Sequence, residues 1–260
     1  MQVLEKEVQN LEKFFHSYGF GLFPFETIYF DKKGAHFLYD HFMRFKRAFW
    51  ILGLGFDLGF EKFKETLERY IACYGKDYGG VRILCLDGNL ILELKEVRYS
   101  KALFQKGFEL KIARTRKDKA NILNYIKTTN IGVNLIEEKS AKRKGFDSCL
   151  FLNQDGFICE AAFANIFFRK DKVIYTPHIL CGLLPGIVRK HVIRVSEELG
   201  YMVKKAYLKI EDIKNMDECF ITSSIAGIFP VLRIDNIEFK QRSFAEYLLS
   251  MEKFERPWVC

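Results

Sequence analysis

The sequence lacks the marks of a protein held together by metal ions or disulfide bonds. Its seven cysteines are odd in number and include no Cys-x-x-Cys pair. Most of them lie in apolar runs, as Cys85 does within residues 83–86. This pattern is typical of reduced, buried thiols and argues against a disulfide framework or a zinc site. We therefore expect no metal ion.

Long apolar segments are also missing. No apolar run is long enough to span a bilayer, and the charged residues 1–7 do not resemble the apolar core of a signal peptide. We therefore expect a cytoplasmic protein with no membrane partner.

Basic residues are in excess, and the formal net charge is +8. Such a charge suits either a nucleic acid or an anionic small molecule. The basic residues are widely spread, with only short clusters such as residues 142–144, and RRM, KH and zinc-finger signatures are absent. We therefore expect a small anionic substrate or cofactor and no nucleic acid. The 26 phenylalanines predict a Phe-rich core in an otherwise ordinary globular composition.

Helix and strand signals predict an α/β (α+β) protein of two domains. The polar stretch 114–119 is interpreted as a linker between a smaller N-terminal α/β domain, residues 1–117, and a larger β-rich C-terminal domain with flanking helices, residues 118–260. Helices are predicted over residues 3–16, 40–52 (with Asp40 as N-cap), 61–74, 129–144 and 185–199, and strands over residues 25–29, 81–86, 90–94, 148–153, 157–168, 173–176 and 218–222.

Glu160 is the residue whose surroundings most need an explanation. It lies within residues 157–168, the most apolar stretch of the second half of the chain. A carboxylate buried there costs several kcal/mol unless a cation meets it. The alternative, a strand residue that points to solvent, fits the sequence about equally well.

Three further features suit a phosphate group. Gly186 opens a helix whose first N–H groups have no intrahelical acceptor, residues 222–227 place small hydroxyl side chains after a buried strand, and Arg44 could bind phosphate through two hydrogen bonds. Taken singly, a capped helix, a simple turn and a surface arginine explain them as well. Lys127, by itself, is an ordinary solvated lysine of a lysine-rich chain.

The order of these features resembles that of the class IV aminotransferases, the fold type IV pyridoxal-phosphate enzymes. The matching motifs are Lys127-Thr128-Thr129-Asn130, residues 144–150, residues 155–160, Asn165-Ile166-Phe167, Thr176-Pro177, residues 184–189, Phe25-Glu26-Thr27, His41-Phe42-Met43-Arg44 and residues 224–231. The resemblance implies a D-amino-acid-aminotransferase-like fold, pyridoxal 5'-phosphate as cofactor, and a homodimer.

The resemblance also implies a role for each matched residue. Lys127 would form the aldimine with the cofactor and later move protons, while Glu160 would keep the pyridine nitrogen protonated. The phosphate would be bound by the residues of the remaining motifs, namely Arg44, Ile187, Val188, Ser223 and Ser224.

Three subfamilies compete for the reaction: branched-chain aminotransferases, D-amino-acid aminotransferases and 4-amino-4-deoxychorismate lyases. Residues 223–231 resemble the lyase form of the final loop, and Val188 stands where aminotransferases often have threonine. The lyase is therefore favoured; it would eliminate pyruvate to give 4-aminobenzoate, a step of folate synthesis. Thr27 is the expected proton donor to the leaving pyruvate. Gly21 to Pro24 replace the family's usual step before the Phe25 motif, which leaves the substrate-facing wall undetermined.

A hypothesis of another class is a cofactor-free or nucleic-acid-binding relative. It predicts no visible absorbance, whereas the enzyme hypothesis predicts a band that depends on Lys127.

Overall fold

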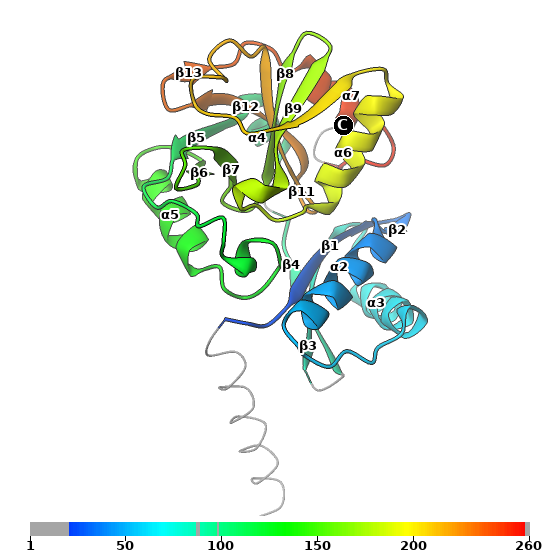
Figure 1. Ribbon diagram of the computed structural model, residues 1–260. Helices are drawn as coiled ribbons and strands as arrows, with labels where there is room; N and C mark the ends of the chain where they lie inside the picture. The colour runs from blue at the N-terminus through cyan, green and yellow to red at the C-terminus, as the bar shows by residue number, and fades with distance from the viewer. Residues whose placement is uncertain (1–20, 87–88, 98, 258–260) are drawn as a thin grey trace, which may run out of the picture.

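The computed structural model describes residues 21–86, 89–97 and 99–257. Two lobes, each built on its own sheet, meet across a waist (Figure 1). The helix expected over residues 3–16 lies outside this range. Among the described helices, none is both long and apolar enough to cross a membrane.

The smaller lobe is an antiparallel sheet of order β2-β1-β3-β4, with two helices packed on one face (Figure 1). Phe42, Phe45 and Phe49 recur at helical spacing, so they line one face of α2 and are buried against the sheet. The elements are β1 (Phe25–Asp31), β2 (Gly34–Ala35), α2 (Leu38–Ile51), α3 (Phe60–Tyr74), β3 (Gly79–Leu86) and β4 (Asn89–Lys95).

The larger lobe is a nine-stranded mixed sheet of order β10-β9-β8-β11-β12-β5-β6-β7, with β13 paired to β12. Its elements are α4 (Lys101–Lys106), β5 (Phe108–Ile112), η1 (Ile122–Asn124), α5 (Gly132–Arg143), β6 (Ser148–Leu152), β7 (Ile158–Ala161), β8 (Asn165–Lys170), β9 (Val173–Pro177), η2 (Ile179–Cys181), α6 (Ile187–Glu198), β10 (Met202–Ala206), β11 (Glu218–Ser223), β12 (Gly227–Ile234), β13 (Ile237–Glu238) and α7 (Ser243–Leu249). A two-lobed α/β protein with a β-rich C-terminal lobe is therefore confirmed.

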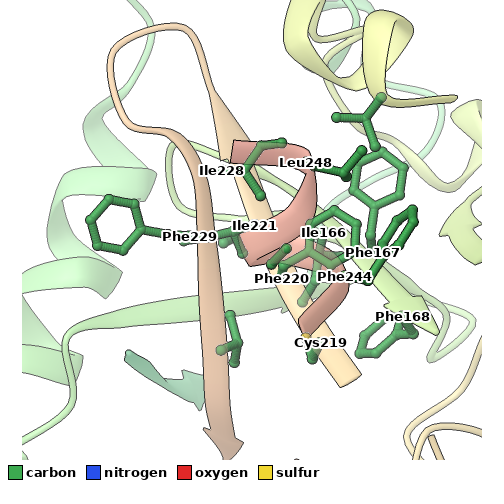
Figure 2. Close-up of a cluster of buried hydrophobic side chains, with 14 of the residues drawn as sticks. Ile166, Phe167, Phe168, Cys219, Phe220, Ile221, Ile228, Phe229, Phe244 and Leu248 are labelled. Carbon is green, nitrogen blue, oxygen red and sulfur yellow. The ribbon is translucent and has the colours of Figure 1, made fainter. Parts of the chain in front are cut away.

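The core of the larger lobe is rich in phenylalanine, as the composition predicts. Phe167 of β8 and Phe220 of β11 stack with ring centroids 5.0 Å apart, and α7 adds Phe244 and Leu248 beside them (Figure 2). This packing fixes strand β11, whose end reaches the waist between the lobes.

The change of sheet occurs earlier in the chain than the expected domain boundary. The small sheet ends at Lys95 and the large sheet begins at Phe108, so residues 108–117 belong with the large sheet. Lys117 itself pairs with Asn153 in an isolated bridge, because the polar stretch runs along the sheet and does not connect two free domains.

Two local expectations are wrong. Helix α2 begins at Leu38 after Phe37, which has a left-handed φ of 53°, and Asp40 lies inside its first turn, where it pairs with His191. The apolar run 157–168 forms two strands instead of one. The turn between them, residues 162–164, has no polar side chain and joins two buried strands. The Ala161 N–H donates to the Ala164 carbonyl at 2.8 Å and closes this turn.

Candidate active site

A cavity of about 280 Å³ lies at the waist and is lined by both lobes. Every residue for which the sequence predicts a role lines it, although they come from six separate segments. They are Thr27, Arg44, Lys127, Glu160, Ile187, Val188, Ser223 and Ser224. The structure thus brings the predicted residues together, and their individual roles stay predictions.

Lys127 is held in place by backbone pairing between the lobes. Its carbonyl accepts from the Phe25 N–H at 3.0 Å, and the Thr129 N–H donates to the Phe23 carbonyl at 2.8 Å. The Lys127 Nζ atom lies 4.3 Å from the centroid of the Phe25 ring. Burial, reinforced by the charge of Arg44, lowers the pKa of Lys127 from 10.5 to about 8. An amine with such a pKa is a far better nucleophile near neutral pH than an ordinary lysine.

Arg44 is fixed by a carboxylate that the sequence analysis left without a role. Glu26, fully buried on β1, accepts from Arg44 Nε and Nη2 at 2.7 Å each and pairs with His41 Nδ1 at 2.6 Å. Burial alone would raise the pKa of Glu26, but Arg44 and His41 lower it to about 2. The Arg44 Nη1 atom also donates to the Pro185 carbonyl at 3.3 Å, so the arginine joins α2 to the start of α6. The cluster orients the guanidinium before any ligand binds.

Glu160 is buried, and its cation in this structure is Lys117. Lys117 Nζ lies 2.5 Å from Glu160 Oε1, and both side chains are about one-tenth exposed. The other oxygen, Oε2, accepts from Asn165 Nδ2 at 3.2 Å and from the Leu184 N–H at 3.1 Å. The solvent-facing alternative for Glu160 is therefore wrong, and Lys117 is a site residue that the linker interpretation missed.

The start of α6 reaches the cavity through a close contact that only glycine permits. A Cβ atom on Gly186 would lie 1.9 Å from Asn165 Oδ1. Asn165 also donates to the Leu184 carbonyl at 2.8 Å, so one side chain orients both Glu160 and the turn before the helix. Ile187 is the first residue of α6, and the unpaired N–H groups of such a helix start favour an anion.

The end of β11 supplies hydroxyl groups to another part of the cavity lining. Ser223 and Ser224 line the cavity, and Ser223 Oγ accepts from the Ala226 N–H at 3.2 Å. Thr222 also lines it, and its Oγ1 atom is buried without a hydrogen-bond partner among the described residues. A buried hydroxyl without a partner is costly, so Thr222 Oγ1 indicates a ligand with a polar group at this point.

The wall from the smaller lobe is formed by Thr27 and Arg82, which face each other across strands β1 and β3. Arg82 Nη1 lies 3.5 Å from Glu93 Oε2, and its Nε atom is buried without a hydrogen-bond partner among the described residues. Sequence reasoning missed Arg82, because only the pairing of β1 with β3 places it beside Thr27. Arg82 adds a second positive charge, beside that of Arg44, to the wall that the smaller lobe contributes to the cavity.

A two-lobed α/β fold with a half-buried lysine in the cavity between the lobes is the architecture of the class IV aminotransferases. Residues 24–234 match the family model described as amino-transferase class IV. The chain belongs to this family, whose cofactor is pyridoxal 5'-phosphate.

Similar proteins include members with two different activities. Aminodeoxychorismate lyase of Bacillus subtilis is 24% identical over 258 residues, which cover 92% of this chain and 87% of that protein. A Rickettsia felis protein described as a probable branched-chain-amino-acid aminotransferase is 36% identical over 151 residues, which cover 56% of this chain. The match spans 52% of the Rickettsia felis protein, about half its length.

A crystal structure of a Legionella pneumophila protein described as a "putative 4-amino-4-deoxychorismate lyase" superposes with a TM-score of 0.83 at 27% identity. The superposition covers 90% of this chain and 92% of that one. The expected D-amino-acid-aminotransferase-like fold is confirmed by this family of structures.

The residues of the cavity fit the cofactor of the family. Among the described residues Thr222 Oγ1 is buried without a hydrogen-bond partner, and the first N–H groups of a helix such as α6 have no acceptor within the helix, so both suit a phosphate. Arg44 lines the same cavity and could add a positive charge. Glu160 is an anion held in a fixed orientation, as a protonated ring nitrogen requires. Within residues 21–86, 89–97 and 99–257, no cluster of His, Cys, Asp and Glu side chains is suited to a metal ion.

Proposed function

We propose that the protein is a 4-amino-4-deoxychorismate lyase, which converts its substrate to 4-aminobenzoate and pyruvate. The observation that carries the proposal is the segment 223–231, which runs from the end of β11 into β12, resembles the lyase form and lines the cavity through Ser223 and Ser224. Likeness to lyases over about nine-tenths of the chain, in sequence and in structure, supports it.

The cofactor would be held by residues from both lobes. Lys127 would bind it covalently, Glu160 would face the ring nitrogen, and the phosphate would meet Arg44 and the N-terminus of α6. When bound, the cofactor supplies an electron sink that stabilises negative charge on the substrate.

Lys127 and Thr27 would move the protons. A lysine with a pKa of about 8 is partly neutral under physiological conditions, so its amine can accept the proton lost from the substrate ring. Thr27 lies on the opposite, small-lobe wall and would donate a proton to the leaving pyruvate. Arg82 beside it would bind a carboxylate of the dicarboxylate substrate.

The test is a coupled reaction with chorismate, glutamine and the aminating synthase, in which 4-aminobenzoate is measured by fluorescence. We expect 4-aminobenzoate from the wild type and none from Lys127→Ala, which should also lose the visible absorbance of the bound cofactor. Pyridoxamine phosphate that accumulates with an amino donor, without any 4-aminobenzoate, would show that the lyase assignment is wrong.

The second candidate is a transaminase acting on branched-chain or D-amino acids. The 36% identity to the Rickettsia felis protein, which exceeds the identity to the lyase, favours it. Incubation with each amino donor and 2-oxoglutarate, followed by measurement of glutamate, separates the two candidates. A protein without any visible cofactor band would instead support the cofactor-free or nucleic-acid-binding alternative.

A homodimer remains our expectation for the assembly. Light scattering on the purified protein gives the molar mass, and about twice the 30.5 kDa of the chain is expected.

A further inference from the structure

Arg256 lies near the C-terminal end of the described chain, yet its side chain is fully buried. Its guanidinium donates to four backbone carbonyls: those of Ser224 at 3.0 Å, Ile225 at 3.3 Å, Phe254 at 3.3 Å and Glu255 at 2.8 Å. Because the donors of a guanidinium form a rigid planar fork, such a set of bonds fixes the relative position of two backbone segments.

A third segment meets the same group. The guanidinium carbon lies 3.9 Å from the centroid of the Tyr29 ring, on the strand that carries Thr27. On the loop side, a Cβ atom on Gly227 would lie 3.3 Å from Arg256 Cγ, and its φ of 73° also favours glycine. Arg256 therefore joins the C-terminal segment, strand β1 and the loop 223–227.

The bonds to the loop determine which way its peptide groups face. In a planar trans peptide the N–H points opposite to the preceding carbonyl. With the Ser224 carbonyl turned to Arg256, the Ile225 N–H points away from the guanidinium. The side chains of Ser223 and Ser224 line the cavity on the same loop. The Ile225 N–H thus faces away from Arg256, while the Ala226 N–H is bonded to Ser223 Oγ within the loop.

We propose that Arg256 is a positioning residue that holds the loop 223–227 in the conformation that binds the cofactor phosphate. The inference rests on the proposed function in one respect, the assignment of Ser223 and Ser224 to the phosphate. Arg256 lies outside residues 24–234, which match the family model.

The test compares two ligands that differ only in the phosphate. Cofactor-free Arg256→Lys is titrated with pyridoxal phosphate and with pyridoxal, and the visible band is recorded. We expect affinity for pyridoxal phosphate to fall at least about tenfold, and affinity for pyridoxal to change less than about threefold, because loss of a hydrogen bond or two to the loop affects only the phosphate side.

Arg242 offers a matched control. It donates to the Gln105 carbonyl at 2.7 Å and the Phe104 carbonyl at 3.1 Å, and its guanidinium lies over the Phe104 ring. Neither Gln105 nor Phe104 lines the cavity, whereas Ser224 and Ile225, which Arg256 binds, do. Arg242→Lys should leave both affinities unchanged. An equal loss for both ligands in Arg256→Lys, or no loss, would refute the proposal.

If Arg256→Lys does not fold, hydrogen exchange of the wild type decides. Pyridoxal phosphate should slow exchange in residues 224–227 and 254–257 together, and protection of the loop alone would overturn the inference. Failure of the wild type to bind pyridoxal phosphate at all would instead contradict the proposed function.

Discussion

Replacing Lys127 by methionine should make the cofactor-free protein more stable near neutral pH. The folded protein holds this ammonium in a cavity where burial and Arg44 lower its pKa to about 8, whereas in the unfolded chain the pKa is near 10.5. A shift of this size corresponds to about 3 kcal/mol at 1.36 kcal/mol per pKa unit. Because Lys127 is only partly shielded from solvent, we expect the methionine variant to gain about 2 kcal/mol.

The sign of the pH dependence follows from proton binding. Between about pH 8 and pH 10.5 the unfolded chain holds a proton on Lys127 that the folded protein has released. The wild type therefore becomes more stable as pH rises through this window. The stability difference between the wild type and Lys127→Met is therefore largest below about pH 8 and disappears as the pH approaches about 10.5.

Urea unfolding of both cofactor-free proteins across this pH range measures the effect. Lys139→Met, on the exposed face of α5, is the control and should show no pH-dependent difference from the wild type. A wild type more stable than Lys127→Met at neutral pH, or a difference that does not change with pH, would refute the electrostatic account of the cavity.

Three further changes test the residues that support the site. Glu26→Gln leaves a buried arginine and histidine without their anion, so it should cost about 3 kcal/mol in urea unfolding and weaken binding of pyridoxal phosphate. Lys117→Met leaves a buried carboxylate without its cation, so thermal stability of the cofactor-free protein should fall, and bound cofactor should restore part of it. Gly186→Ala should displace the Asn165 side chain and lower the melting temperature and cofactor affinity, whereas Gly132→Ala, where a Cβ meets nothing within 4 Å, should do neither.

The site was predicted from the order of motifs along the chain, and several of these motifs lie at or next to the end of a helix or strand. Lys127 precedes α5, Ile187 opens α6 and Ser223 ends β11. The topology of a sheet brings strand and helix ends together on one side of it. Residues at these ends therefore tend to line the same cavity.

The supporting residues could not be predicted in the same way. Lys117 lies in a run of charged side chains, and nothing in residues 114–119 distinguishes the one cation that turns inward. That choice depends on Glu160, which is 43 positions away and becomes a neighbour only through the pairing of β6 with β7. Pairings of this kind require the register of the sheet, which local patterns do not give.

The net positive charge of the chain suits either a nucleic acid or a small anionic molecule, and the lining of the cavity favours the small molecule. Its lining contains four basic side chains, Arg44, Arg82, Lys117 and Lys127, against a single acidic one, Glu160. Lys117 is paired with that carboxylate, and burial keeps Lys127 partly neutral. Arg44 and Arg82 are held at separate points of the lining, each by a carboxylate outside it, Glu26 for Arg44 and Glu93 for Arg82. We expect Arg44 to meet a phosphate and Arg82 a substrate carboxylate. A cavity between the lobes with its cations separated in this way suits a small molecule with two anionic ends, whereas a nucleic acid would need the charge along an extended surface.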